Sequence, residues 1–398
     1  MLFNLKHLHA ALEIQRLGSI TLTAETIHLS QSAVTQGLNK LEALLGFELF
    51  TRSHAGLAAT SEGIIFLKRA ARAIRFLIDA RSLLGHTYRD NPLFLHLMTT
   101  GQLRAVKTVV ERGSYTRAAE QLNLSQPTVY RAVKDMERLT RKPLFSKSEH
   151  GVSPSVHAKR LARQISLFFN EITQGIDEVN NHRGRPGGSL RIGSLPLSRT
   201  TIVPSAVVAV TETFPSAKVS IIEGPYREQL DGLLNGQIDM IVGALRSSDT
   251  DSDIAQQSLF EDELSIVMKC GHALDNEDEI SAKALQKLAW VAPRQGTPAR
   301  EAFTAFFSRH NLPEPSEIVE SSSLVATRGL LLESDRVALL SSRQVEIEVR
   351  HHLLSVKGQR LEGTQRKIGI TFRKSWRPTM LQQAFISLIK QNTAQLSR

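Results

Sequence analysis

Two stretches of the sequence carry polar side chains with the spacing of a helix that reads DNA. Such a helix enters the major groove and hydrogen-bonds base edges near its N-terminal end. The first stretch offers Gln31, Ser32, Thr35, Gln36 and Asn39. The second offers Gln126, Thr128, Tyr130, Arg131 and Lys134. Amide side chains suit adenine and arginine suits guanine, so both stretches are candidate reading helices.

Cations accompany both stretches. Arg52 and Lys147 follow at equivalent distances and are expected to track the phosphate backbone. Residues 1–188 hold 25 Lys and Arg against 15 Asp and Glu, whereas residues 189–398 hold 24 of each. The whole net charge of +10 therefore lies in the first half, which favours a polyanion partner over a merely solvated polar surface.

The second stretch is expected to supply more of the affinity for phosphate. Its additional cations are Arg138, Arg141 and Lys142, alongside Arg131, Lys134 and Lys147. The first stretch is expected to act more through neutral hydrogen bonds from its amide side chains.

The second half of the chain offers turns that could bind a small molecule. A helix N-terminus favours anions through its free amides and its dipole. The candidates lie just before expected helices: Ser198, Thr200, Pro225, Tyr226, Arg294, Gln295, Thr297 and Ser322. Thr297 precedes Pro298 and predicts an N-cap. For each hydroxyl, helix capping alone is the competing interpretation.

Catalytic chemistry has little support in the sequence. There is no G-x-S-x-G elbow, P-loop, G-x-G-x-x-G or H-E-x-x-H motif, so we expect no enzyme, cofactor or metal site. The adjacent His351 and His352 are better explained as surface residues than as metal ligands. The single cysteine, Cys270, excludes a disulfide scaffold and favours a reducing compartment, which predicts a cytoplasmic protein. No apolar run reaches the ~18 residues that cross a bilayer, and the N-terminus does not resemble a secretory signal.

An internal repeat positions the two polar stretches. The 39 residues from Gly18 and the 39 from Gly113 align without a gap, at an offset of 95, with 15 identities. Two copies are too few for a solenoid and indicate a duplicated small domain.

Each copy has the pattern of a winged helix-turn-helix. In the first, Gly18 breaks an apolar-faced helix, a short helix covers residues 21–28, and Ser30 caps a third helix over residues 31–45. A hairpin, or wing, is expected at residues 47–59. The domains are predicted at residues 1–60 and 95–155.

A long helix follows each domain. Linker helices are predicted at residues 61–90 and, with a hinge, 156–188. Apolar residues at Ile64, Leu67, Ala71, Ile74 and Ile78 are spaced as in a coiled-coil seam, and a similar series runs from Leu161 to Val179. Such a seam predicts dimerisation, with packing onto the chain's own domain as the alternative.

The Gly- and Pro-rich segment at residues 181–189 marks a domain boundary. Beyond it, short apolar runs such as LRIGSL, IDMIVGAL and KIGITF alternate with helical stretches. This alternation predicts an α/β domain at residues 189–398 with a largely parallel sheet. The fold class is therefore an α/β multidomain protein.

Both copies resemble the N-terminal domain of LysR-type transcriptional regulators. The similarity lies in AETIHLSQSAVTQGLNKLEALLGFELFTR at 24–52 and AEQLNLSQPTVYRAVKDMERLTRKPLFSK at 119–147. The second half resembles the family's effector-binding domain at LRIG (190–193), NGQIDMIVG (235–243), GHAL (271–274) and WVAPRQGTP (290–298). The family norm is one such N-terminal domain, and the second copy departs from the pattern at Arg141-Lys142 and Lys147.

The resemblance implies two tandem winged helix-turn-helix domains with linker helices, then a two-lobed, periplasmic-binding-protein-like effector domain. It implies a transcriptional regulator that binds double-stranded DNA and a small-molecule effector such as an organic acid or sugar. It also implies a homo-oligomer, dimer or tetramer, that contacts RNA polymerase and no membrane. Two alternatives remain: an architectural or autoregulatory DNA-binding protein whose second half only oligomerises, and a solute-binding or enzymatic α/β domain tethered by the duplicated domains.

Overall fold

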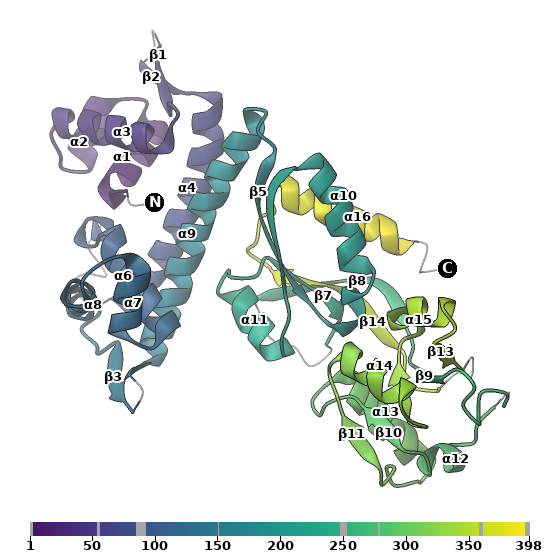
Figure 1. Cartoon of the computed structure of the whole chain (residues 1–398). Coiled ribbons are helices and arrows are strands. Elements are labelled where there is room, and N and C mark those ends of the chain that lie inside the picture. Colours follow the sequence, from purple (N-terminus) through teal and green to yellow (C-terminus); the bar gives the residue numbers. More distant parts are fainter. Residues whose placement is uncertain are drawn as a thin grey trace. The chain divides into compact units, whose positions relative to one another are not determined.

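Three helices and a hairpin form the first winged domain: α1 (Leu5–Leu17), α2 (Ile20–Thr26), α3 (Gln31–Leu45), β1 (Phe50–Ser53) and β2 (Gly56–Ala59) (Figure 1). The helix boundaries follow local signals. Gly18 ends α1 at φ 67°, and Gly46 ends α3 at φ 77°. The Ser30 hydroxyl accepts the backbone N–H of Ala33 at 3.1 Å and caps α3. The predicted third helix is confirmed residue for residue.

The second winged domain repeats this order as α6 (Thr100–Arg112), α7 (Tyr115–Leu122), α8 (Gln126–Thr140), β3 (Phe145–Ser148) and β4 (Gly151–Pro154). Equivalent contacts recur in both copies. Glu42 accepts the backbone N–H of Leu49 at 2.6 Å, and Glu137 accepts that of Leu144 at 2.7 Å. The two domains are therefore built alike, down to the carboxylate that anchors each wing.

This computed structural model describes residues 3–53, 56–84, 93–149, 151–246, 253–277, 279–357 and 361–394. The chain divides into two units, one of residues 1–189 with 215–218 and 234–237, the other of the remaining residues from 190 onward. Within the described ranges, no helix is both long enough and apolar enough to cross a membrane.

The long helices α4 (Ser61–Ala80) and α9 (Val156–His182) pack along each other inside the first unit (Figure 1). Arg183, just after α9, bonds Glu62 near the start of α4, and Arg72 bonds Glu171 further along, so the helices run antiparallel. The seam is thus filled by the chain's own second helix. The seam therefore packs within the chain, as the alternative prediction stated. It is not covered by a helix of another chain, as the dimerisation prediction expected.

The predicted seam is correct for α9 and only partly correct for α4, where Leu67 and Ile74 are buried as expected. Leu161, Ile165, Phe168, Ile172 and Val179 are all buried. In α4, however, Ile64 and Ile78 are 55% and 43% exposed and Ala71 is exposed. The buried face of α4 is instead formed by Phe66, Leu67, Ala70, Ala73, Ile74 and Leu77, with Arg69 among them. The helix also ends at Ala80, short of the predicted residue 90, and a 3-10 turn follows at Arg81–Leu83.

A single hydrophobic core joins both winged domains to both long helices. It runs from Phe3 to Val179 and includes Leu8, Val106 and Phe168. The short 3-10 helix Phe94–Leu97, which precedes the second domain, contributes Phe94 and Leu95. The two domains are therefore one packed body.

A histidine pair links α1 to this 3-10 helix and makes the stability of the first unit pH-dependent. His9 Nδ1 lies 3.1 Å from His96 Nε2, so one ring donates and the other accepts. Burial lowers the pKa of His96 to about 4, with Lys6 and the His9 ring adding to the shift. Burial also lowers the pKa of His9, against the opposing charge of Glu13.

Because both folded pKa values lie below the ordinary 6.5, the unfolded chain takes up these protons first. The stabilisation is complete above about pH 6.5 and declines as the pH falls towards 4. We expect the melting temperature to drop between pH 7.5 and 5.5 in the wild type, and to drop less in His96→Gln. Equal losses in both proteins would show that the pair does not carry the effect.

The second unit contains two mixed sheets. The first has the order β6-β5-β7-β14-β8, from β5 (Gly187–Ser194), β6 (Ser216–Ile222), β7 (Met240–Ala244), β8 (Ile254–Asp262) and β14 (Arg366–Arg373). The second has the order β11-β10-β12-β9-β13, from β9 (Ser265–Lys269), β10 (Trp290–Ala292), β11 (Ile318–Glu320), β12 (Val337–Leu340) and β13 (Leu354–Val356). The chain enters the second lobe after β8 and returns to the first in β14.

Helices accompany each lobe. The first lobe has a 3-10 turn at Pro196–Arg199, α10 (Ile202–Thr213), α11 (Tyr226–Leu234) and α16 (Met380–Ala394). The second lobe has α12 (Ala282–Gln286), α13 (Pro298–Arg309), α14 (Leu324–Leu332), a 3-10 turn at Ser342–Gln344 and α15 (Glu346–Arg350). The predicted two-lobed α/β architecture is confirmed.

Two details of that prediction are corrected. The sheets are not largely parallel, because β14 pairs antiparallel with β7 and β8, and β9 pairs antiparallel with β12 and β13. The boundary segment is also shorter than predicted, since α9 continues to His182 and β5 begins at Gly187.

Candidate nucleic-acid interface and effector site

The first reading helix presents its polar residues outward. Gln31, Ser32, Gln36 and Asn39 are exposed, while Val34, Leu38 and Leu41 are buried in the core. Thr35 is half-buried, and its hydroxyl donates to the Gln31 carbonyl at 2.9 Å. The residues proposed to read bases thus share one accessible face of α3.

The second reading helix, α8, presents a more cationic and aromatic face. Gln126, Thr128, Tyr130 and Arg131 are exposed over buried Val129. Lys134 is partly engaged within its own helix: its Nζ lies 2.7 Å from Glu137 and 5.4 Å from the Tyr130 ring centre. The hydrogen bond to Glu137 raises the pKa of Lys134.

The wings carry one exposed cation each, in matching register. In the strand register of the hairpins, Arg52 on β1 lies opposite Leu57 on β2, and Lys147 on β3 lies opposite Val152 on β4. Both are exposed, as a backbone contact requires. The predicted positions on the wing are therefore equivalent in the two copies.

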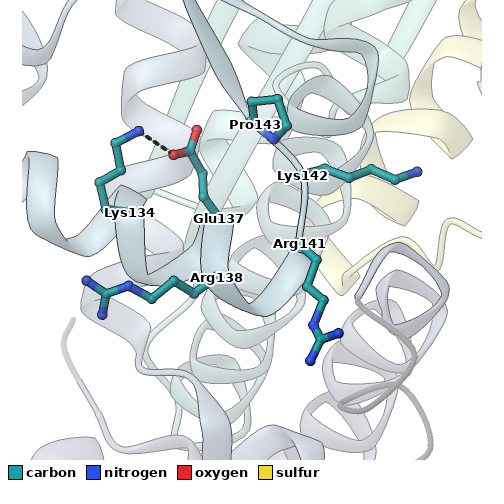
Figure 2. Close-up of a pocket in the computed structure, with 6 residues that line it drawn as sticks. All are labelled: Lys134, Glu137, Arg138, Arg141, Lys142 and Pro143. Atoms are coloured by element: carbon teal, nitrogen blue, oxygen red, sulfur yellow. Dashed lines mark hydrogen bonds and ion pairs between the residues drawn. The ribbon is translucent and has the colours of Figure 1, made fainter.

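A cationic hollow of 390 Å³ lies at the C-terminal end of α8 (Figure 2). Its lining is four cations, one carboxylate and a proline: Lys134, Arg138, Arg141, Lys142, Glu137 and Pro143. Arg138 pairs with Asp135 at 3.0 Å. Arg138, Arg141 and Lys142 are all exposed at the helix end. The hollow concentrates positive charge where the sequence predicted the greater share of phosphate affinity.

Arg141 occupies a strained backbone conformation at this hollow. Its φ is 51°, in the left-handed region, where the equivalent residue of the first copy is Gly46 at φ 77°. A non-glycine residue there costs about 1–2 kcal/mol. Strain retained at a surface position is consistent with a functional side chain.

Arg141→Gly is expected to raise the free energy of unfolding by about 1 kcal/mol through relief of this strain, and to weaken DNA binding through loss of a cation. Urea unfolding and fluorescence anisotropy with labelled duplex would measure the two effects. Lys142→Ala is the matched control, which should weaken binding without changing stability. An Arg141→Gly variant that binds DNA as well as the wild type would remove this side chain from the interface.

The first effector turn is partly consumed by internal hydrogen bonds. Ser198 is fully buried, and its hydroxyl bonds the Ser194 hydroxyl at 2.9 Å and the Val242 carbonyl at 2.8 Å. Thr200 lies within 3.5 Å of the Arg343 carbonyl. Ser198 thus holds the turn in place, and its hydroxyl is already engaged.

The other effector candidates occupy helix starts, as expected. Thr297 accepts the backbone N–H of Arg300 at 3.2 Å and caps α13. Arg294 and Gln295 are exposed beside it, and Ser322 is exposed just before α14. Pro225 is exposed and Tyr226 is buried at the start of α11.

Arg246, which the sequence analysis missed, joins two of these turns. Its guanidinium lies 4.2 Å from the Tyr226 ring centre, and its Nη1 donates to the Gly296 carbonyl at 3.1 Å. Its Nε is buried and has no hydrogen-bond partner among the residues that the structure describes. The signal was its place just outside the carboxyl end of strand β7, where α/β sheets bind ligands.

Other chemistry finds little support. No group of three His, Cys, Asp or Glu side chains in the described ranges is arranged to hold a metal ion. Burial and the charge of Asp275 raise the pKa of the Cys270 thiol, so this cysteine is not activated as a thiolate.

Two family models match the chain. The model "Bacterial regulatory helix-turn-helix protein, lysR family" matches twice, at residues 5–64 and 100–159. The model "LysR substrate binding domain" matches residues 183–394. The first model covers the two winged domains, and the second covers the two-lobed domain.

Curated relatives and solved structures agree with these matches. The transcriptional regulator GalR of Pseudomonas putida is 31% identical over 98% of this chain and 97% of its own, so the match extends over both winged domains. The regulator PcaQ of Agrobacterium fabrum is 22% identical over 76% of this chain and 96% of its own. In fold, full-length OxyR of Pseudomonas aeruginosa covers 74% of this chain and 98% of its own, with TM-score 0.56 and 20% identity. The structure of full-length CbnR in complex with its target DNA covers 74% of this chain and 99% of its own, with TM-score 0.52 and 18% identity.

Proposed function

The chain belongs to the LysR family of transcriptional regulators, and we propose that it reads operator DNA through α3 and α8 together. Regulation of DNA binding by a small molecule in the second unit is the family's arrangement, and this chain has both parts. The observation that carries the proposal is the exposure of two polar helix faces on equivalent scaffolds. The reading residues are the exposed side chains of α3 and α8, with Arg52 and Lys147 as phosphate contacts.

For the effector, we propose an anionic molecule, an organic acid in preference to a sugar. Arg246 supports this choice because its buried Nε–H group can donate a hydrogen bond to a ligand. Its side chain also joins the turns at Tyr226 and Gly296. Arg294 and the capped start of α13 add positive potential beside it. Thr297 and Gln295 are the neutral contacts of the same turn.

Three further proposals complete the function. The cytoplasm is the proposed compartment, supported by the single cysteine. A homo-oligomer is the proposed assembly, and RNA polymerase is the proposed protein partner, both supported by membership of the family.

A thermal-shift screen of organic acids and sugars on the full chain tests the effector. A ligand at 100 times its Kd should raise stability by about 2.7 kcal/mol. Arg246→Met is expected to abolish the shift, because it removes the charge and the buried donor. Ser281→Ala, which removes the cap of α12 in the second lobe, should keep it. A full response in Arg246→Met would place the effector elsewhere.

A further inference from the structure

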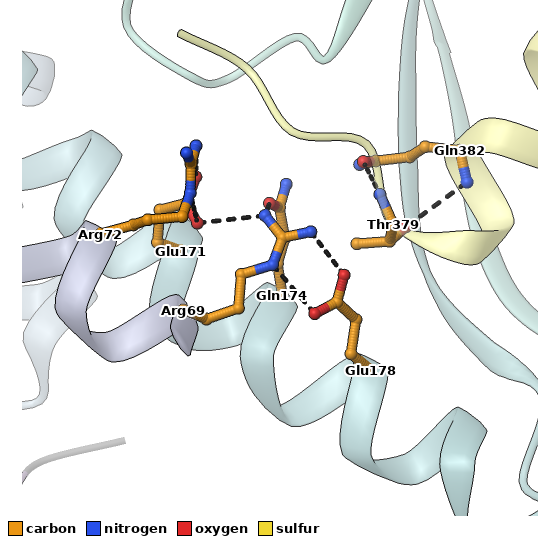
Figure 3. Close-up of polar contacts among 7 residues, drawn as sticks. All are labelled: Arg69, Arg72, Glu171, Gln174, Glu178, Thr379 and Gln382. Atoms are coloured by element: carbon orange, nitrogen blue, oxygen red, sulfur yellow. Dashed lines mark hydrogen bonds and ion pairs between the residues drawn. The ribbon is translucent and has the colours of Figure 1, made fainter. Parts of the chain in front are cut away.

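A buried polar cluster lies in the seam between α4 and α9 (Figure 3). Arg69 is only 4% exposed, Glu171 5% and Gln174 1%. The Arg69 guanidinium donates through Nε and Nη2 to both oxygens of Glu178, at 3.0 and 2.5 Å. Its Nη1 donates to Glu171 and to Gln174, at 3.1 Å each.

Arg72 completes the cluster from the edge of the seam. Its Nε and Nη2 donate to the two oxygens of Glu171, at 3.1 and 3.0 Å. Both arginines belong to α4, and both glutamates and the glutamine belong to α9. The two sides of the seam are therefore chemically unlike.

The repeat makes this asymmetry informative, because each helix has an equivalent 95 residues away. The equivalents of Arg69 and Arg72 in α9 are Gln164 and Leu167. Neither carries a positive charge. If two α9 helices paired in the same geometry, Glu171 and Glu178 would lose both arginines.

Pairing of two α4 helices is also unfavourable, because it removes partners from Arg69. The equivalents of Glu171, Gln174 and Glu178 are Phe76, Asp79 and Leu83. Arg69 would then keep one carboxylate in place of two and lose its bidentate partner. A buried charge without its partners is strongly destabilising, so the cluster opposes like pairing as well as favouring unlike pairing.

The antiparallel seam also relates the two winged domains by an approximate twofold, because it exchanges α4 with α9. Two domains related in this way approach a duplex in opposite directions. Their reading faces differ, however: α3 offers Gln31, Gln36 and Asn39, whereas α8 offers Arg131 and Lys134.

We infer that the Arg69–Glu171–Glu178 cluster restricts the seam to unlike pairing, so that each reading unit holds one domain of each kind and fits a duplex with two unlike, inverted half-sites. This inference rests on the proposed function, since it assumes that both helices read DNA. It adds the arrangement of the operator DNA to the proposed function: the operator is an inverted pair of half-sites that differ in sequence.

Selection from a random-sequence duplex library with the full chain tests the inference. The expected product is an inverted motif with two different halves. Gln31→Ala/Gln36→Ala should erase the preference in one half, and Arg131→Ala/Lys134→Ala should erase it in the other. A palindrome with identical halves, both weakened by the same pair of substitutions, would overturn the inference. A library with no enriched sequence would refute the proposed function itself.

Cross-linking tests the pairing without DNA. A Cβ placed on Gly175 would lie 2.9 Å from the Arg69 Cβ, so a small separation of the two helices brings the pair to the spacing of about 3.5–4.5 Å found in disulfides. In a Cys270→Ser background, Arg69→Cys/Gly175→Cys is expected to form a disulfide that joins α4 to α9.

The matched control uses Ala80, which is the α4 equivalent of Gly175. Arg69→Cys/Ala80→Cys can form a disulfide between chains only if two α4 helices pair, so we expect no linked dimer. Efficient dimer formation by this variant, together with no α4–α9 disulfide in Arg69→Cys/Gly175→Cys, would contradict unlike pairing. Because both variants remove Arg69, the DNA selection, with the seam intact, provides the independent measurement should they not fold.

Discussion

Replacement of Arg69 by methionine is expected to lower the free energy of unfolding of the first unit by about 3–5 kcal/mol. The substitution leaves Glu171 buried with only Arg72 and leaves Glu178 without its bidentate partner. We expect the lower end of this range because the Glu178 side chain is 23% exposed to solvent. Urea unfolding of the full chain, followed by the helical circular dichroism signal, would measure the change.

Arg350→Met is the matched control for this prediction. Arg350 also pairs with a glutamate, Glu346, at 2.8 Å, but the two side chains are 68% and 54% exposed. An exposed pair of this kind contributes about 0–1 kcal/mol. A change for Arg69→Met that is as small as the control's would show that the seam does not depend on its polar cluster.

The second large effect is on DNA affinity as the salt concentration rises. The two domains expose cations at Arg52, Arg131, Arg141, Lys142 and Lys147, and the first 188 residues carry the whole net charge. A protein that makes 6–10 phosphate contacts loses roughly 10³- to 10⁵-fold in affinity between 50 and 200 mM salt, because counterions are released from the DNA.

Fluorescence anisotropy of the full chain on a selected duplex, over a series of salt concentrations, would give the slope. Each cation that contacts a phosphate should reduce the slope by about 1 when it is replaced by alanine. Lys147→Ala is expected to do so, and Lys283→Ala, on α12 of the second unit, is not. An affinity that does not change with salt would exclude the proposed phosphate contacts.

Local signals made the reading helices predictable from the sequence. The boundaries of α3 depend on Ser30 and Gly46, and α8 begins after the equivalent cap at Ser125. Neither signal requires knowledge of the rest of the fold. The polar face of each helix follows directly once its buried residues are identified by their spacing.

The seam was harder to predict because its buried face includes charge. Hydrophobic periodicity selected Leu67 and Ile74 correctly, but it also selected Ile64 and Ile78, which are exposed, and it gave no sign that Arg69 is buried. Arg69 is buried because its partners Glu171 and Glu178 lie about a hundred residues later in the chain. The pattern of one helix carries no information about such partners.

The sheets of the second unit show the same limit. Strand β14 pairs with β7 and β8 after the chain has built the whole second lobe, so the antiparallel register is not visible locally. The effector turns were found by their caps, whereas Arg246 joins two of them through contacts that depend on the fold.

Sequence-specific recognition by both winged domains is tested most directly by enrichment of genomic DNA fragments with the purified full chain. A variant with both reading faces removed, Gln31→Ala/Gln36→Ala/Arg131→Ala/Lys134→Ala, is the comparison. We predict that the wild type enriches a small set of discrete fragments at near-physiological salt and that the variant loses them. Even coverage of the genome by the wild type, unchanged in the variant, would contradict the account and identify an architectural DNA-binding protein.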